Sequence, residues 1–192
     1  SEPGTTFLAN TGSQTVGGST TRVLASDLDN LSSFLSQRFG YQTGPYQGYT
    51  HSTPAEKFLL RGDYNINSAN RISLRYLSLD SSTDILVSNS SSLGFGTRRG
   101  GNPNTTGLNF QNSNYKILEN IRSFVGEWNS AIGSGISNNL IVGYTKQDES
   151  RDSLGTFFPF VDILQGGSVY TSFGFEPFTP NNELRYNSLQ IQ

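Results

Sequence analysis

Two runs of alternating hydrophobic and polar residues, joined by a short polar stretch, stand out between Ala55 and Leu79. In each run aliphatic and aromatic residues take one side of an extended chain, while mostly charged or polar residues take the other. The first run alternates Phe58, Leu60, Gly62 and Tyr64 with Arg61, Asp63 and Asn65, and the second alternates Ile72, Leu74 and Tyr76 with Arg71, Ser73 and Arg75. This period of two predicts a β-hairpin. Soluble sandwiches and transmembrane barrels both carry such strands, so the pattern leaves the solvent of each face open.

Alternation returns further along the chain and predicts five antiparallel strands in all, at about 55–65, 70–80, 114–130, 137–148 and 183–192. The connections at 65–70 and 131–137 are short, whereas 80–113 is long and polar. Bacterial outer-membrane barrels have short turns on the periplasmic side and long loops outside. The alternation of short and long connections between the predicted strands therefore favours a barrel over a sandwich.

A different period appears at residues 26–39, where it predicts one short helix. Leu28, Leu31, Leu35 and Phe39 would form its apolar stripe, Ser26 could cap its start, and Gly40 would end it. We expect a loop or a weak hairpin over 1–21, and an irregular tyrosine-rich connection from Tyr41 to Pro54.

Composition narrows the class of protein. Hydrophobic residues make up only 33% of the 192 residues, aromatic residues reach 12%, and there are 21 glycines, a balance that favours β-structure with long polar connections.

The net charge of −2 provides no field for holding phosphates, so nucleic acid is not expected as a partner. The chain has no cysteine, which excludes disulfides, thiolate metal sites and a cysteine nucleophile. It contains no run of about 18 apolar residues that would predict a transmembrane helix. The absence of methionine leads us to expect a processed or excised piece of a longer protein.

The order of several short motifs resembles the barrel region of TonB-dependent outer-membrane receptors, specifically the Oar-like group. The matching pieces are 27–31 (DLDNL), 38–41 (RFGY), 58–65 (FLLRGDYN), 71–76 (RISLRY), 127–130 (EWNS), 137–145 (SNNLIVGYT), Arg151-Asp152, 158–160 (FPF), 172–178 (SFGFEPF) and 181–183 (NNE). Each piece alone is a common strand or turn consensus, and the resemblance lies in their order across residues 22–192.

The resemblance implies an all-β fold: a segment of an antiparallel transmembrane β-barrel with long extracellular loops and one short helix. Residues 1–192 would form part of one barrel domain, because nothing in them resembles a plug or a TonB box. It also implies a transport protein of the Gram-negative outer membrane that binds and imports a bulky ligand. Its partners would be outer-membrane lipid, the remaining strands and plug of the receptor, and indirectly the TonB complex; it would be no enzyme and need no cofactor.

In that barrel, Phe58, Leu60, Ile72 and Leu74 would meet lipid, and Tyr64 and Tyr76 the membrane interface. Tyr64, Tyr76, Trp128 and Tyr144 are all expected near strand ends. Arg61, Asp63 and Arg75 would lie on the lumen side and could pair across strands. With Arg98 and Arg99, at the expected tip of an outer loop, they are the candidate ligand-binding residues.

Other candidate chemistry is weaker. Arg61-Gly62-Asp63 spells an integrin-binding tripeptide but lies inside a predicted strand. His51 is the only histidine and is expected in a polar loop without zinc partners. The carboxylates Asp148, Glu149 and Asp152 could suggest Ca²⁺, but the loop pattern with its central glycine is missing, so we expect no metal site. The glycine-rich stretch 94–101 lacks the lysine of a phosphate-binding loop.

Two other classes remain as alternatives. The chain could be a soluble secreted or cell-surface β-sandwich that binds carbohydrate or protein, with the aromatic-rich region 157–178 as core or binding platform. A glycosidase is a third possibility, although Glu56, Asp63, Glu119 and Glu127 show no spacing that marks a catalytic pair. If no second sheet of the chain covers Phe58 and Leu60, the barrel is favoured over the sandwich.

Overall fold

The computed structural model describes residues 2–88, 103–177, 179 and 182–192. They are mostly β-structure, with one α-helix and one turn of 3-10 helix, η1 (Gln111–Ser113), among the described residues. The chain divides into two compact units. Unit 1 comprises residues 1–53, 83–117 and 151–182, and unit 2 comprises 54–82, 118–150 and 183–192.

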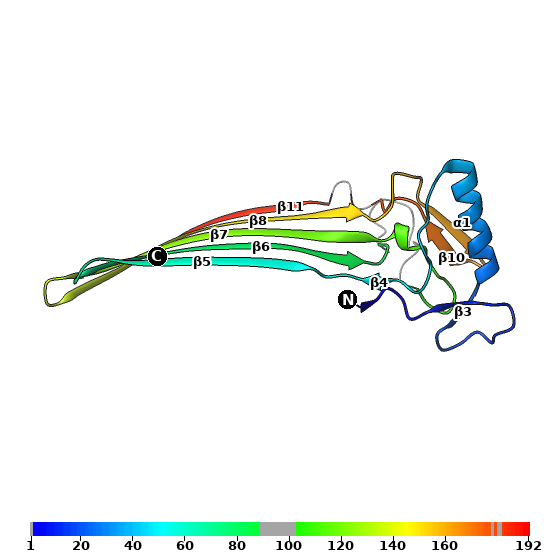
Figure 1. Ribbon diagram of the computed structural model, residues 1–192, viewed down its shortest axis with the longest axis horizontal. Coiled ribbons are helices and arrows are strands. Elements are labelled where there is room, and N and C mark those ends of the chain that lie inside the picture. The colour runs from blue at the N-terminus through cyan, green and yellow to red at the C-terminus, as the bar shows by residue number, and fades with distance from the viewer. Residues whose placement is uncertain (1, 89–102, 178, 180–181) are drawn as a thin grey trace. The chain divides into compact units, whose positions relative to one another are not determined.

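Unit 2 is built on a single five-stranded sheet (Figure 1). Its strands, in spatial order, are β11 (Leu184–Ile191), β8 (Ile136–Ser153), β7 (Tyr115–Ile132), β6 (Asn70–Ile85) and β5 (Ala55–Asn67). Chain neighbours pair antiparallel, as in β5 with β6, and β8 also pairs antiparallel with β11. All five strands predicted from alternation are confirmed, and four of them extend beyond the predicted range.

Two tight turns join strands of this sheet, as predicted. Ser68 and Ala69 form the first turn, where the Asn67 side-chain oxygen accepts hydrogen bonds from the Ala69 amide and the Asn70 side chain. In the second turn, Gly133 adopts φ +63°, a left-handed conformation that suits glycine. β5 and β11 form the two edges, so the described strands make an open sheet.

Unit 1 contains the helix and three small two-stranded sheets. β1 (Glu2–Pro3) pairs with β4 (Thr50–His51), β2 (Leu8–Asn10) pairs in parallel with β3 (Thr20–Leu24), and β9 (Val161–Gln165) forms a hairpin with β10 (Ser168–Phe173). The expectation of a loop or weak hairpin over 1–21 is therefore wrong in detail. β1 pairs with the distant β4, and β2 pairs with β3 in parallel, which is not the arrangement of a hairpin.

The helix α1 (Ala25–Phe39) matches the predicted range and ends as expected, because Gly40 takes φ +68° and its amide donates to the Ser36 carbonyl. Its start differs from the prediction. The N-cap residue is Leu24, and no side chain caps the helix. Ser26 lies inside the first turn and does not cap it. The predicted apolar stripe also ends early, since Leu28 and Leu35 are buried but Phe39 is 58% exposed.

The core of unit 1 combines side chains from all three of its segments. It consists of Ala9, Val23, Leu28, Leu35, Tyr41, Leu108, Phe110, Tyr170 and Phe173, with Phe158 and Ile163 among the residues packed against it. Tyr41 stacks on Phe158 with ring centroids 4.3 Å apart, and its hydroxyl accepts a hydrogen bond from the Gly174 amide. Burial raises the pKa of Tyr41. Of the two readings of the aromatic region 157–178, the structure supports a local core.

This core corrects two expectations. Leu108 and Phe110 are fully buried, although they lie in the connection expected to be a long polar loop over 80–113. Tyr41 and Tyr49 are also buried, in the segment expected to be irregular. Both stretches are punctuated by glycine and proline, so their few apolar residues have no period that would reveal a buried side.

Candidate functional site

The five-stranded sheet of unit 2 carries different chemistry on its two faces. Directly opposed residues of an antiparallel pair point to the same side, so register assigns the faces. Leu60 opposes Tyr76, Gly62 opposes Leu74 and Tyr64 opposes Ile72. We call this side the apolar face. The intervening residues, among them Arg61, Asp63, Asn65, Arg71, Ser73 and Arg75, define the polar face.

Side-chain contacts extend both faces across the inner strands. Trp128 donates its indole N–H to Asn70, and Tyr144 bonds Asn187, which places these aromatic residues on the apolar face. On the polar face, the hydroxyls of Ser123 and Thr145 lie 3.0 Å apart. The apolar face thus comprises Phe58, Leu60, Tyr64, Ile72, Leu74, Tyr76, Phe124, Trp128, Leu140, Val142, Tyr144, Leu189 and Ile191.

No part of the described chain covers this apolar face. Phe58 is 55% exposed, Leu60 59% and Tyr64 69%, and exposure continues through Trp128 and Val142 on the inner strands. Every buried hydrophobic residue of the described chain belongs to unit 1; in unit 2 only Ser73 and Ser130 are buried. Unit 2 is therefore a single layer without a core of its own.

The aromatic residues of the apolar face are not all at strand ends. Tyr64 and Trp128 lie close to the tight turns, as expected. Tyr76 and Tyr144 lie well inside β6 and β8, opposite Leu60 and Leu189. For these two tyrosines the expected position near a strand end is wrong, because the strands extend further than predicted.

The polar face holds a cluster of charges centred on Asp63. Its carboxylate pairs with Arg61 and with Arg71, each at 3.0 Å, and accepts a hydrogen bond from Ser73. The pairing of Arg61, Asp63 and Arg75 across strands does not form as expected, because Arg61 pairs with Asp63 within its own strand and the cross-strand partner of Asp63 is Arg71. These side chains are about one-third to one-half exposed, so the pairs add little stability by themselves.

Arg75 is not part of this cluster, contrary to expectation. It stands directly opposite Arg61, and among the described residues it forms no ion pair. Two like charges opposed on neighbouring strands disfavour the pairing, and the hydrogen bond that Arg61 donates to Asp63 offsets part of that repulsion. The polar face also has an aliphatic part, since Leu59 opposes Leu77 and Lys57 opposes Leu79.

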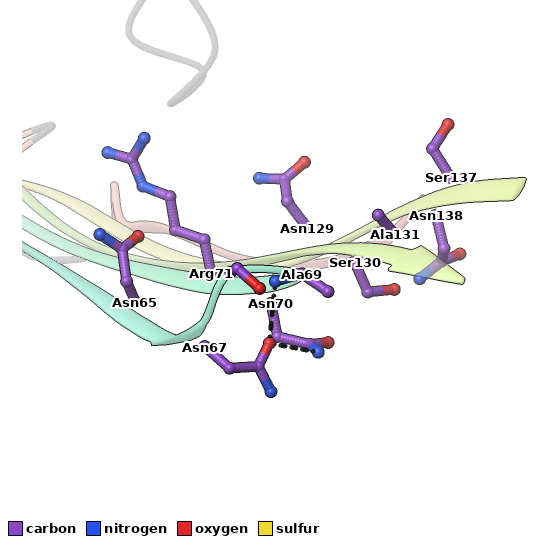
Figure 2. Close-up of a pocket in the computed structure, with 11 residues that line it drawn as sticks. Asn65, Asn67, Ala69, Asn70, Arg71, Asn129, Ser130, Ala131, Ser137 and Asn138 are labelled. Carbon is purple, nitrogen blue, oxygen red and sulfur yellow. Dashed lines mark hydrogen bonds between the residues drawn. The ribbon is translucent and has the colours of Figure 1, made fainter. Parts of the chain in front are cut away.

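A shallow hollow of about 560 Å³ lies beside the first tight turn, against the end of β7 and the start of β8. Figure 2 shows Asn65, Arg71 and Asn129 extending to one side of the sheet, and Asn67 and Ser130 to the other. Its lining is asparagine-rich and neutral except for Arg71. Arg71 and Asn129 are not among the ligand-binding residues expected from the sequence, although they alternate with the apolar positions Ile72 and Trp128.

A charged row crosses the apolar face beyond its hydrophobic residues. Arg122 binds both carboxylate oxygens of Asp80 at 2.8 Å, and Lys146 pairs with Asp148 at 2.7 Å. The apolar face therefore ends in hydrated charge on the side away from the tight turns.

The remaining candidates lie elsewhere. Arg98 and Arg99 fall outside the described residues. His51, expected in a polar loop, lies in β4 and is half-buried, and its Nε2 atom has no partner in the described chain. Asp148, Glu149 and Asp152 lie in the strand β8 and not in a loop. The described residues hold no group of three or more metal-binding side chains that could hold an ion.

Comparisons with family models, with curated proteins and with solved structures find no match for this chain. Within the described residues, no helix has both the length and the hydrophobicity needed to cross a bilayer.

Proposed function

We propose that the chain is part of the barrel of a TonB-dependent outer-membrane receptor of the Oar-like group, and that unit 2 is a stretch of the barrel wall. One observation carries the proposal: a single-layer sheet has one continuous apolar face that the described chain leaves uncovered, and a polar face behind it. A soluble antiparallel sheet buries its apolar face on a core. A transmembrane barrel turns that face to lipid and its polar face to an aqueous lumen.

The dimensions of the apolar face support this assignment. On β5 it runs from Phe58 to Tyr64, within a strand of 13 residues. A strand of about 9 to 11 tilted residues crosses the hydrocarbon core of a bilayer. The row of Arg122, Asp80, Lys146 and Asp148 then lies at the level of the lipid headgroups, where charge remains hydrated.

The order of the elements along the chain supports different roles for the two units, with unit 2 as barrel wall and unit 1 as outer loops. The long connections before β5, between β6 and β7, and between β8 and β11 supply the segments of unit 1. They leave the strands at the ends opposite the two tight turns, which corresponds to the outer side of a barrel. We assign first contact with a bulky imported ligand to unit 1, with Arg98 and Arg99 in the connection between β6 and β7.

In this proposal the protein acts in the Gram-negative outer membrane and catalyses no reaction. The free edges of β5 and β11 pair with the remaining strands of the receptor, since an unpaired edge cannot face lipid. The polar face, with Arg61, Asp63 and Arg75, meets the lumen and the plug. Energy comes indirectly from the TonB complex, and nucleic acid is not a partner.

The alternative of a soluble sandwich requires a second sheet over the apolar face. In the described residues, Phe58, Leu60 and Leu74 have no such cover. No observation on the sheet favours that alternative.

Trp128 provides a direct test, because it is the only tryptophan of the chain and lies on the apolar face. The full chain is reconstituted into bilayers that contain brominated lipid, and tryptophan fluorescence is measured. We expect strong quenching by bromolipid and weak quenching by aqueous iodide.

The matched control moves the indole to the polar face, as Ser123→Trp in a Trp128→Phe background. For this variant we expect the reverse pattern, with iodide as the stronger quencher. The proposal fails if Trp128 is quenched by iodide and not by brominated lipid. It also fails if the monomer is folded in water without detergent and its sheet unfolds in one cooperative transition on heating.

A further inference from the structure

The polar face of unit 2 contains an aliphatic patch that an aqueous surrounding does not favour. Leu59 opposes Leu77, and two residues further along each strand Lys57 opposes Leu79. Leu59 is 60% exposed, and Leu77 and Leu79 are partly exposed. Contact between aliphatic side chains and water is unfavourable, and contiguous exposed patches of this kind mark binding surfaces. The patch therefore suits the apolar part of a ligand.

The aliphatic patch continues onto the neighbouring strand β7. Ser123 lies on the polar face, and Ile121 and Val125 share its side because residues two apart on a strand point the same way. Both of these aliphatic side chains are partly exposed. The patch thus spans the adjacent strands β5, β6 and β7.

Two like charges border the aliphatic patch. Arg61 and Arg75 are directly opposed on the polar face. On β5, the next residue of that face is Leu59. Arg75 is exposed, and within the described residues it forms no ion pair. The repulsion between two guanidinium groups in this arrangement decreases when an anion binds between them.

The carboxylates near this arginine pair do not neutralise it. Asp63 is shared between Arg61 and Arg71. Glu127 acts electrostatically on Arg61, but its carboxylate accepts hydrogen bonds from two asparagine amides. With Arg75, three arginines thus face two carboxylates, and this part of the sheet carries an excess of positive charge. Its charge is complementary to an anion.

We propose that this surface binds an amphiphilic anion, in which a carboxylate is joined to an aliphatic chain. The carboxylate lies between Arg61 and Arg75, which donate charge-assisted hydrogen bonds, and the aliphatic chain lies along Leu59, Leu77 and Leu79. Side chains on one face recur about every 7 Å along a strand, so a chain of about that length reaches the leucines. The amphiphile is the bulky imported ligand or a part of it, and this assignment rests on the proposed function because it needs the polar face open to an aqueous lumen.

The test uses the full chain in lipid nanodiscs, with labelled leucine methyl groups and hexanoate as the probe. Hexylamine has the opposite charge on a similar chain, and acetate has the charge without the chain. We expect millimolar hexanoate to shift the Leu59 methyl signals, acetate to shift them much less and hexylamine not at all. Leu60, on the apolar face, should stay unmoved. Unmoved Leu59 signals, an equal response to hexylamine, or an equal shift of Leu60 overturns the proposal.

Two variants locate the anion. Arg75→Gln removes a charge without breaking an ion pair, so hexanoate should bind about tenfold more weakly while the sheet stays as stable as before. Arg71→Gln is the matched control, because Arg71 lies on the same strand and face but is bonded to Asp63. The assignment is wrong if Arg71→Gln weakens binding as much as Arg75→Gln does.

A third variant tests the apolar part of the surface. Leu59→Asn, read from the Leu77 methyl signals, should weaken hexanoate binding severalfold toward that of acetate and leave acetate binding unchanged. An unchanged affinity for hexanoate would mean that the leucines do not contact the chain, and the proposal would be overturned.

The indole placed on the polar face by Ser123→Trp in the Trp128→Phe background separates this assignment from the proposed function. If brominated lipid quenches that indole and iodide does not, the faces are assigned wrongly and both proposals fail. If iodide quenches it and hexanoate does not bind, only the ligand assignment fails.

Discussion

The two units of this chain differ in where they place their hydrophobic side chains, which unit 1 buries and unit 2 leaves exposed. Unit 1 has only short strands and one helix, yet it contains every buried hydrophobic side chain of the described chain. Unit 2 has the longest and most regular strands, yet it buries only two serines. Regular secondary structure and a hydrophobic core are therefore separable here. Unit 1 is stabilised by its own packing, while unit 2 needs a surrounding that covers its apolar face.

The largest difference between the two units is expected when one phenylalanine in each is truncated to alanine. Phe110 is fully buried and Phe58 is 55% exposed. Phe110→Ala should lower the free energy of unfolding of unit 1 by about 3 to 5 kcal/mol, because it leaves a cavity. Phe58→Ala should change the stability of unit 1 by less than about 0.5 kcal/mol. Denaturation of the full chain in detergent, followed by near-UV circular dichroism, measures both; equal losses would contradict the division.

A charge placed on each face of the sheet tests the proposed solvent of unit 2. Val142 lies on the apolar face and Thr145 on the polar face of the same strand. Val142→Arg should disfavour folding into bilayers by about 2 to 4 kcal/mol, the usual cost on a lipid-facing surface. Thr145→Arg should cost much less. The free energy of folding into lipid vesicles compares the two, and a larger loss for Thr145→Arg would reverse the assigned faces.

Two tyrosine hydroxyls of unit 1 donate to aspartates of α1, one from a buried and one from an exposed position, so the effect of burial on such a bond can be compared. Tyr170 is buried and bonds both Asp27 and the Leu24 amide, whereas the bond from Tyr46 to Asp29 is exposed. Tyr170→Phe should destabilise unit 1 by about 2 kcal/mol, and Tyr46→Phe by less than about 1 kcal/mol. Matched melting curves of the two variants measure this difference. Equal effects would mean that burial does not set the strength of these bonds.

Alkaline pH should weaken unit 1 by a smaller and graded amount. Burial raises the pKa of Tyr41 and of Tyr49 above the usual value of 10. For a group whose pKa is raised on folding, the stabilisation is complete below the unfolded pKa and is lost as pH rises through the folded value. Unit 1 should therefore lose stability above about pH 10. Tyrosinate absorbance followed against pH reports it, and tyrosines that all ionise at pH 10 without unfolding would contradict it.

How far the sequence predicts this molecule depends on periodicity. The five long strands and the helix were predictable, because a period of two or of 3.6 extends over many residues in each. The polar cluster on the sheet was predictable only in part. Alternation places Arg61, Asp63 and Arg75 on one face, but register decides that Asp63 meets Arg71 and that Arg75 meets Arg61.

The core of unit 1 could not be predicted for a physical reason. Leu108 and Phe110 belong to a short stretch without a repeating pattern, and their partners, such as Tyr41 and Phe173, are far away in the chain. Burial there results from long-range packing, which no local window contains. A hollow of about 300 Å³ in unit 1 has the same origin, since Leu31 of α1 and Ile163 of β9, which both line it, are more than 130 residues apart.

The interleaving of three segments in unit 1 also has a consequence for folding kinetics. The bond between the Leu24 amide and the Tyr170 hydroxyl spans 146 residues, whereas the β5–β6 and β7–β8 pairs are local hairpins. Contacts of high sequence separation form slowly, because the loop entropy is lost before they contribute. The hairpins should thus form first. Their unpaired edges remain exposed until residues near Tyr170 have been synthesised and the long-range contacts can form. For a chain of this kind, the interval between the first hairpin and the last long-range contact is the period of greatest aggregation risk, and chaperones that shield strand edges would act then.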